Sequence, residues 1–506
     1  MNKKHLILAG FVLLKFILHY SLIGPEYELH RDEFLYLDQA RHPAWGYISV
    51  PPLTAWLSRI VGLLGNGIFW VKFFPALFGA LTMVVVWKAI ESLKGNLFAL
   101  ILGATGVLFS VLLRLNILYQ PNSLDVLCWT AFYYALIRYI QNEHPRWLYI
   151  GAVVFAIGFL NKYNVVFQLI GLLPAILLTE HRRIFTNRHF YFAILTGLVL
   201  IAPNLVWQYS NNFPVVWHMK ELAKTQLVNV DRVDFLKTQL LFFLGALFII
   251  LAGLYALWAY APFRKYRLFF WALVFTLATF IYFKAKDYYA IGLYPVYIAF
   301  GAAYLGVLLQ EGWKRYLQPV AVAIPVLLFL PMYSVVFPNK SPAYIEQNGD
   351  RYKALGLLRW EDGKDHSLPQ DFADMQGWKE LAQKVAKVHA AYPDPGNTLV
   401  LCDNYGQAGA INYYTNGKVR AVSFNADYVE WFELSRPYRN LVRVISYDEV
   451  EQELRDISPY FDTVVVADSL TNRFARERGT TIVAFSGAKV DVNAKIREEV
   501  AEVKKR

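Results

Sequence analysis

Long apolar stretches recur along the first two-thirds of the chain and are missing from the last third. A helix needs roughly 20 mainly apolar residues to cross a bilayer. Of the 506 residues, 56% are hydrophobic and 16% aromatic, more than one soluble core would use. The sequence predicts a polytopic α-helical membrane protein with about eleven spans, at residues 6–23, 69–90, 98–115, 124–140, 147–160, 165–178, 190–207, 235–259, 267–283, 289–308 and 316–336.

The fifth and sixth spans are short, and the polar sequence Asn161-Lys162-Tyr163-Asn164 separates them, either as a tight turn or as a kink in one long segment. Lys15 stands near the middle of the first span, where a charge in contact with lipid is costly. We therefore expect Lys15 to face the helix bundle, where pairing with a neighbouring helix explains its presence.

Lysine and arginine in the short loops indicate the orientation, because they accumulate on the cytoplasmic side. With the N-terminus inside, every cytoplasmic loop receives a basic set: Lys88 and Lys94; Arg138 and Arg146; Arg182, Arg183 and Arg188; Arg264, Lys265 and Arg267; Lys314 and Arg315. An odd number of spans then exports the tail, which predicts a transmembrane domain, residues 1–338, and a C-terminal periplasmic domain, residues 339–506. These loops largely account for the formal charge of +11, so nucleic-acid binding is disfavoured.

The chemically unusual residues fall on the external side of this topology. The first external loop, residues 25–66, mixes aromatic residues with isolated charges and is expected to form interfacial helices in the headgroup plane. The remaining external segments hold Pro121-Asn122-Ser123-Leu124-Asp125, the Lys162-Tyr163 break, residues 211–234 and Lys284-Ala285-Lys286-Asp287. The sequence thus predicts a functional site on the non-cytoplasmic face.

Several short motifs follow one another in order: Asp32-Glu33, Arg41-His42-Pro43-Ala44-Trp45-Gly46-Tyr47, Pro51-Pro52-Leu53, Pro203-Asn204-Leu205-Val206-Trp207-Gln208 and Lys286-Asp287-Tyr288-Tyr289. With the Asp125 and Lys162-Tyr163 motifs, they resemble the bacterial dolichyl-phosphate-mannose-protein mannosyltransferase-like glycosyltransferases of the GT-C fold, a wider group that includes the aminoarabinose transferase acting on lipid A. The resemblance spans the membrane region and extends weakly to Asn404-Tyr405-Gly406-Gln407-Ala408-Gly409-Ala410. It implies transfer of a sugar from a polyprenyl-phosphate-linked donor to a lipid, glycan or protein acceptor, at the periplasmic side of the bacterial inner membrane.

Sugar transfer needs a group that takes the acceptor's proton as the acceptor oxygen attacks the anomeric carbon. A positioned carboxylate increases the rate of such a step by about 10²- to 10⁴-fold. Asp32 is the first candidate for this general base. The resemblance implies the same assignment, because the first acidic residue of the family's loop motif aligns with Asp32. Glu33 is the nearby alternative. Both residues could instead hold the loop at the interface or cap a helix.

Asp125 stands at the start of the fourth span, where a carboxylate is costly unless it faces protein or water. It either joins Asp32 in the site, orienting the acceptor or helping to hold a cation, or it caps the fourth helix. The sequence leaves a divalent cation open, because no second His or Glu stands at a convincing ligand spacing. The candidate metal ligands are Asp32, Glu33, Asp125 and His30.

The leaving group in this interpretation is a lipid phosphate, which requires cations and donors where negative charge develops. Arginine can hold a phosphate through two parallel hydrogen bonds, and lysine acts as a point charge. The alternative is that these long side chains extend to the lipid headgroups. The predicted donor-phosphate set is Arg31, Lys162, Tyr163, Lys284, Lys286, Tyr288 and Tyr289, of which Lys162 and Lys286 are the strongest candidates.

The C-terminal region alternates amphipathic helical stretches, such as residues 372–391, with strand-like runs at residues 398–402, 419–424, 441–445, 463–467 and 481–485. This pattern predicts a small soluble α/β domain. Asp403-Asn404-Tyr405-Gly406 follows the first of these strands, at the position where open α/β sheets bind ligands. The segment is either a site for the acceptor or a glycan, or a structural strand-to-helix turn.

Other classes of function are disfavoured. The sequence has no P-loop or dinucleotide fingerprint, which argues against nucleotide hydrolysis and against cytoplasmic nucleotide sugars. The alternatives to a transferase are a transporter or flippase of lipid-linked sugars and a non-catalytic membrane scaffold. The lack of an internal repeat, and the gathering of polar groups on one face, weaken the transporter hypothesis.

Overall fold

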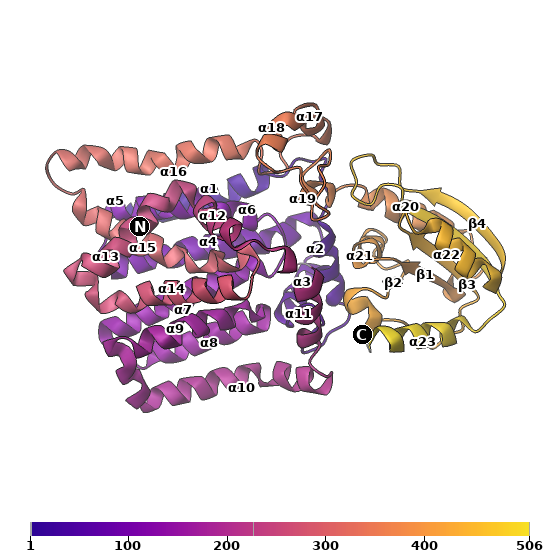
Figure 1. Ribbon diagram of the computed structural model, residues 1–506, viewed down its shortest axis with the longest axis horizontal. Coiled ribbons are helices and arrows are strands. Elements are labelled where there is room, and N and C mark those ends of the chain that lie inside the picture. The colour runs from indigo at the N-terminus through magenta and orange to yellow at the C-terminus, as the bar shows by residue number, and fades with distance from the viewer. Residues whose placement is uncertain (1–2, 226, 505–506) are drawn as a thin grey trace. The chain divides into compact units, whose positions relative to one another are not determined.

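The computed structural model describes residues 3–225 and 227–504. The chain divides into two compact units, each assembled from three segments (Figure 1). The membrane unit comprises Met1–Leu22, Ala44–Thr54 and Phe69–Phe337, and the sheet unit comprises Ile23–Pro43, Ala55–Ile68 and Pro338–Arg506. The first external loop therefore contributes two segments to the sheet unit.

Helices build the membrane unit, and most of them are apolar. They are α1 (Lys3–Ser21), α4 (Ile68–Ser92), α5 (Leu97–Leu108), α6 (Val111–Leu115), α7 (Asn122–Asn142), α8 (Arg146–Asn161), α9 (Val166–Leu177), α10 (Arg188–Ser210), α11 (Pro214–Thr225), α12 (Arg232–Phe242), α13 (Leu247–Ala259), α14 (Arg267–Tyr282), α15 (Pro295–Leu308) and α16 (Leu317–Tyr333).

Several of these helices can cross a membrane, which confirms the predicted polytopic architecture. Among the described residues, 5 helices are long and apolar enough, and the number rises to 8 if each of 3 bent helix pairs is one span. The count of about eleven stays a prediction, because some predicted spans consist of short or broken helices. The third divides into α5 and α6, and the eighth bends by 68° between α12 and α13.

The polar break between the fifth and sixth spans is a turn between two helices. α8 ends at Asn161, and the Lys162 backbone is extended, with φ −158° and ψ 128°. A 3₁₀ turn, Tyr163–Val165, then leads into α9. The break thus places polar side chains in the middle of an apolar sequence, where Asn161 and Asn164 are buried.

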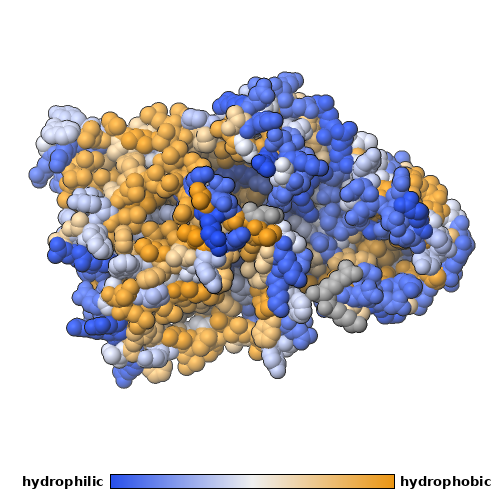
Figure 2. Space-filling view, viewed as in Figure 1, coloured by the Kyte–Doolittle hydropathy of each residue, from blue (hydrophilic) through white to orange (hydrophobic). Residues whose placement is uncertain are grey.

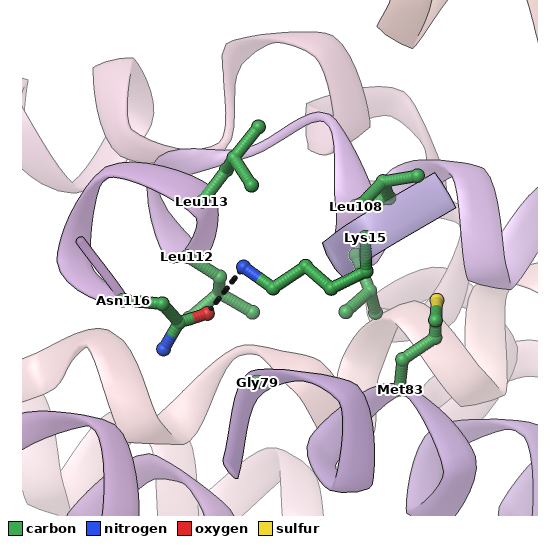
Figure 3. Close-up of a pocket in the computed structure, with 8 residues that line it drawn as sticks. Lys15, Gly79, Met83, Leu108, Leu112, Leu113 and Asn116 are labelled. Carbon is green, nitrogen blue, oxygen red and sulfur yellow. Dashed lines mark hydrogen bonds between the residues drawn. The ribbon is translucent and has the colours of Figure 1, made fainter. Parts of the chain in front are cut away.

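Lys15 faces the interior of the membrane unit, as expected from its cost in lipid. Its side chain is 3% exposed, and its ammonium donates to Asn116 Oδ1 at 2.8 Å. Figure 3 shows the lysine extending from α1 to Asn116, with Gly79 of α4 beside the pair. A Cβ at Gly79 would lie 2.1 Å from that amide oxygen, so only glycine leaves room for the contact.

The outer surface of the membrane unit is apolar. Figure 2 shows hydrophobic residues covering much of its visible face. Large side chains are exposed along two of its helices: Leu195 and Val199 on α10, and Leu327 and Leu330 on α16. An apolar surface of this extent suits contact with lipid, since soluble monomers rarely expose so large a patch.

A mixed five-stranded sheet organises the sheet unit, in the order β2-β1-β3-β5-β4. β1 pairs in parallel with β2 and β3, and β5 pairs antiparallel with β3 and β4. The predicted α/β domain and its five strands are confirmed. The strands are β1 (Thr398–Cys402), β2 (Ala421–Ser423), β3 (Asn440–Ile445), β4 (Phe461–Ser469) and β5 (Thr481–Ala488).

Helices complete the sheet unit, and two of them come from the first external loop: α2 (Arg31–Gln39) and α3 (Leu53–Leu63, which begins in the membrane unit). The others are α17 (Pro342–Gln347), α18 (Gly349–Ala354), α19 (Gln370–Ala373), α20 (Trp378–Ala390), α21 (Tyr405–Tyr414), α22 (Val450–Ile457) and α23 (Val492–Val503).

α2 packs against α20 and α21, and this corrects the expectation that its apolar side chains face lipid headgroups. Phe34 is fully buried and contacts the rings of Trp378, Tyr413 and Tyr414, at centroid distances of 5.9, 5.5 and 5.8 Å. A short amphipathic helix fits any apolar partner, and here the C-terminal segment supplies one. α3 keeps an exposed apolar side that includes Leu63, so its interfacial position stays a prediction.

Candidate active site

In the membrane unit, Asp125 is buried near the start of α7 and is held by side-chain donors. Its side chain accepts hydrogen bonds from the Trp129 indole N–H at 3.2 Å and from the Asn164 amide at 2.9 Å. The same Asn164 nitrogen donates to the Tyr289 carbonyl at 3.1 Å. Asn164 therefore joins three segments that are far apart in sequence: α7, the α8–α9 break and the segment that follows α14.

Lys162 lies beside this group. Its ammonium donates to Asn122 Oδ1 at 2.7 Å and lies 4.9 and 4.5 Å from the ring centroids of Tyr288 and Tyr289. Both tyrosines belong to a 3₁₀ helix, Asp287–Leu293. Within the described residues, no carboxylate pairs directly with the Lys162 ammonium. We call Lys162, Tyr288, Tyr289, Asn122, Asn164 and Asp125 the lysine cluster.

Tyr163 follows Lys162 in sequence, but its hydroxyl serves another network. It donates to Asn204 Oδ1 at 3.0 Å and accepts from Gln208 at 2.8 Å, both on α10. Asn204 in turn donates to the Trp45 carbonyl at 2.7 Å. Next to it, a Cβ on Gly46 would lie 2.3 Å from the Trp207 ring. These contacts join the Trp45-Gly46 segment to α10 in the structure.

The two lysines after α14 differ in their surroundings. Lys284 has a left-handed backbone with φ +51°, and its ammonium donates to the Val228 carbonyl at 3.3 Å. Lys286 is the N-cap of the 3₁₀ helix that holds Tyr288 and Tyr289, and its ammonium makes no hydrogen bond among the described residues. Of this pair, Lys286 is the one with an ammonium left to contact a ligand.

The remaining predicted site residues lie in the sheet unit, at the start of α2. Asp32 and Glu33 occupy its first turn, with His30 as the N-cap. His30 Nδ1 accepts from the Asp32 N–H, and Glu33 Oε2 accepts from the His30 N–H at 2.7 Å. This reciprocal arrangement is a capping box. Glu33 is fully buried, so its carboxylate stabilises the helix start.

Asp32 is the more accessible of the two carboxylates, with its side chain 29% exposed. Its Oδ1 accepts a hydrogen bond of 2.6 Å from the Tyr405 hydroxyl. Arg31 stacks over the Tyr405 ring at 4.7 Å, and its guanidinium is 4.0 Å from Asp374. Burial and the negative charge of Asp32 raise the pKa of Tyr405 well above its usual value, so its hydroxyl stays protonated.

Of the four candidate metal ligands, His30, Asp32 and Glu33 belong to the sheet unit and Asp125 to the membrane unit. The capping box of α2 already engages His30 Nδ1 and the Glu33 carboxylate. Across residues 3–225 and 227–504, no three His, Cys, Asp or Glu side chains are grouped to hold a metal ion.

Sequence reasoning identified most of the charged groups but missed their neutral partners. The structure brings Asp125, Lys162, Tyr288 and Tyr289 together, whereas Arg31, Asp32 and Glu33 gather in the sheet unit. Asn122 and Asn164 were not predicted as site residues. The available signal was an amide side chain at an apolar helix end, where an unpaired polar group is costly.

Comparison with known proteins agrees with this architecture. Residues 49–207 match the family model of dolichyl-phosphate-mannose-protein mannosyltransferase. No curated protein matches the sequence.

Two solved structures are similar in fold. ArnT from Cupriavidus metallidurans, bound to undecaprenyl phosphate, has a TM-score of 0.59 at 14% identity, over 97% of this chain and 99% of that chain. The archaeal oligosaccharyltransferase AglB from Archaeoglobus fulgidus, in complex with an inhibitory peptide and a dolichol-phosphate, has a TM-score of 0.52 at 11% identity, over 90% and 71%. The chain therefore shares its fold with these two proteins, and residues 49–207 are similar to the mannosyltransferase family.

Proposed function

We propose that this protein transfers a hexosyl or pentosyl group from a polyprenyl-phosphate-linked donor to a lipid, glycan or protein acceptor, on the periplasmic side of the bacterial inner membrane. The observation that carries the proposal is the lysine cluster. Lys162 has a positive charge with an amide oxygen and two aromatic rings around it, and no carboxylate pairs with it among the described residues. Such a charge suits an anionic ligand at the membrane, and a lipid phosphate is the ligand bound by the similar ArnT structure.

In the proposed reaction, the acceptor hydroxyl gives its proton to the Asp32 carboxylate while its oxygen bonds to the anomeric carbon. The bond between the anomeric carbon and the phosphate oxygen breaks, and its electron pair leaves with the polyprenyl phosphate. Lys162 and Lys286 stabilise the negative charge that the phosphate gains. A base positioned in this way contributes about 10²- to 10⁴-fold to the rate.

The acidic residues receive separate roles in this proposal. Asp32 is the base, because its carboxylate is partly accessible, whereas that of the neighbouring Glu33 is fully buried. Glu33 is assigned to the capping box. Asp125 is a positioning residue: through Asn164 it holds the turn that carries Lys162.

Phosphate recognition can be tested before the sugar is known. The full-length protein in lipid nanodiscs is titrated with undecaprenyl phosphate and, in parallel, with undecaprenol, and binding is followed by native mass spectrometry. We expect tighter binding of the phosphate, and about a tenfold or greater loss of that preference in Lys162→Ala. Lys314→Ala, a lysine of the opposite predicted face, is the matched control. Equal affinity for the two lipids contradicts the proposal.

Transfer is tested through the leaving group that all such donors share. Undecaprenyl-phosphate hexoses and pentoses are incubated with the protein and a membrane-lipid, glycan or peptide acceptor, and released undecaprenyl phosphate is quantified. Asp32→Asn should bind undecaprenyl phosphate normally and release none from the donor. A flippase would move the donor across the bilayer without consuming it, and a scaffold would do neither.

A further inference from the structure

The contact between Tyr405 and Asp32 joins residues that are 373 positions apart in sequence. At 2.6 Å, the hydrogen bond from a phenol to a carboxylate has the short length typical of a charge-assisted bond. Tyr405 is the first residue of α21, in the segment for which the sequence left a ligand site and a structural turn as alternatives.

The position of Tyr405 is fixed by the capping of α21. Asn404 accepts from the backbone N–H groups of Gly406 and Gln407, at 3.0 and 3.1 Å. Glu477 then accepts from the side-chain amides of both Asn404 and Gln407, at 3.2 and 2.8 Å. The segment is thus a braced helix start, and Tyr405 has little freedom to move away from α2.

Close packing of α2 against α21 also fixes the position of Asp32 relative to Tyr405. A Cβ on Gly406 would lie 3.2 Å from Arg31 Cβ, and a Cβ on Gly409 would lie 2.8 Å from Phe34 Cβ. These two glycines let the helices approach until the Tyr405 hydroxyl reaches Asp32. Arg31 covers the Tyr405 ring and is itself near Asp374, which pairs with Arg476 at 3.0 Å.

We propose that Tyr405 is the positioning residue for the Asp32 base: its hydroxyl fixes the rotation of the carboxylate and stabilises its ionised form. This inference rests on the proposed function, and it gives the C-terminal domain a part in the chemistry instead of in acceptor binding. The hydrogen bond must weaken as Asp32 accepts the acceptor's proton, so Tyr405 affects both the orientation and the strength of the base.

The first test is Tyr405→Phe, which removes only the hydroxyl. We expect kcat for release of undecaprenyl phosphate to fall by about 10- to 100-fold with KM for the acceptor unchanged, and the acid limb of the kcat profile to move to higher pH. Tyr447→Phe, an exposed tyrosine of the same unit, is the matched control. A rise in KM with kcat intact overturns the inference and assigns Tyr405 to acceptor binding.

A second variant keeps the test valid if the phenylalanine disturbs folding. Site-specific 3-fluorotyrosine at position 405 retains the ring and makes the phenol a stronger donor. The acid limb should then move to lower pH, and an unchanged limb overturns the inference. If the wild-type protein releases no undecaprenyl phosphate from any donor, the proposed function fails. If the wild-type protein does release it and both Tyr405 variants behave like the wild type, only the positioning role fails.

Discussion

Asn164 holds Asp125: the amide nitrogen lies 2.9 Å from Asp125 Oδ2 and also donates to the Tyr289 carbonyl. Asp125 is 4% exposed, so its carboxylate depends on these donors. Asn164→Ala should destabilise the protein by about 1 to 3 kcal/mol, the cost of a buried acceptor that loses its partner. It should also weaken undecaprenyl phosphate binding, because the turn of Lys162 loses its anchor. Thermal unfolding in detergent measures the first effect, with exposed Asn142→Ala as the control. Unchanged stability and binding would show that Asn164 has no such role.

Substitution of Lys15 and substitution of Asn116 should destabilise the protein by different amounts. Asn116→Ala leaves a buried ammonium without its acceptor, whereas Lys15→Met replaces the charge with an apolar chain of similar length. Asn116→Ala should therefore lower the thermal unfolding midpoint more than Lys15→Met. The double variant should be no worse than Asn116→Ala alone. Gly79→Ala should resemble Asn116→Ala, because its methyl group would displace the Asn116 oxygen. Equal effects of the two single variants would contradict this account.

The two carboxylates at the start of α2 should respond differently to neutralisation. Glu33→Gln keeps an oxygen that can accept from the His30 N–H, so kcat should stay within about twofold and stability should fall by about 1 kcal/mol or less. Asp32→Asn should abolish release of undecaprenyl phosphate from the donor. Loss of activity in Glu33→Gln with retained activity in Asp32→Asn would reverse the assignment.

His42 predicts a pH dependence of stability on the acid side. Burial, with Arg41 and Arg420 nearby, lowers the pKa of His42 to about 4, and its ring stacks on Trp431 at 4.2 Å. Between about pH 6.5 and 4 the unfolded chain takes up a proton that the folded chain does not, so stability falls as the pH decreases through this range. In His42→Phe, the thermal unfolding midpoint should depend less on pH within this range. The same slope in both proteins would refute the prediction.

The orientation can be tested by cysteine labelling, because Cys128 and Cys402 are both buried and should contribute little background. An impermeant maleimide added to intact spheroplasts should label Lys224→Cys, in the predicted external segment. It should label Arg264→Cys, in a predicted cytoplasmic loop, only after permeabilisation. Labelling of Arg264→Cys in intact spheroplasts would invert the topology and the proposed side of the reaction.

Charge and hydropathy were sufficient to predict the helical membrane architecture and the strands of the sheet, because both follow from local periodicity. They also identified Lys162, Tyr288, Tyr289 and Asp125, which converge in the structure. The partner of Asp32 could not be predicted, because nothing local to either residue links position 32 to position 405. The neutral amides of Asn122 and Asn164 carry no charge signal, and their roles depend on which helix ends meet.

The burial of α2 by α20 and α21 has a consequence for biogenesis. The helix leaves the ribosome early, whereas Trp378, Tyr413 and Tyr414, which cover Phe34, are made after the whole membrane unit. Until then these three rings cannot cover Phe34 on the apolar side of α2. That side must be sheltered by the lipid surface or by a chaperone, and a chain cut short before α20 would leave that side permanently uncovered and open to aggregation.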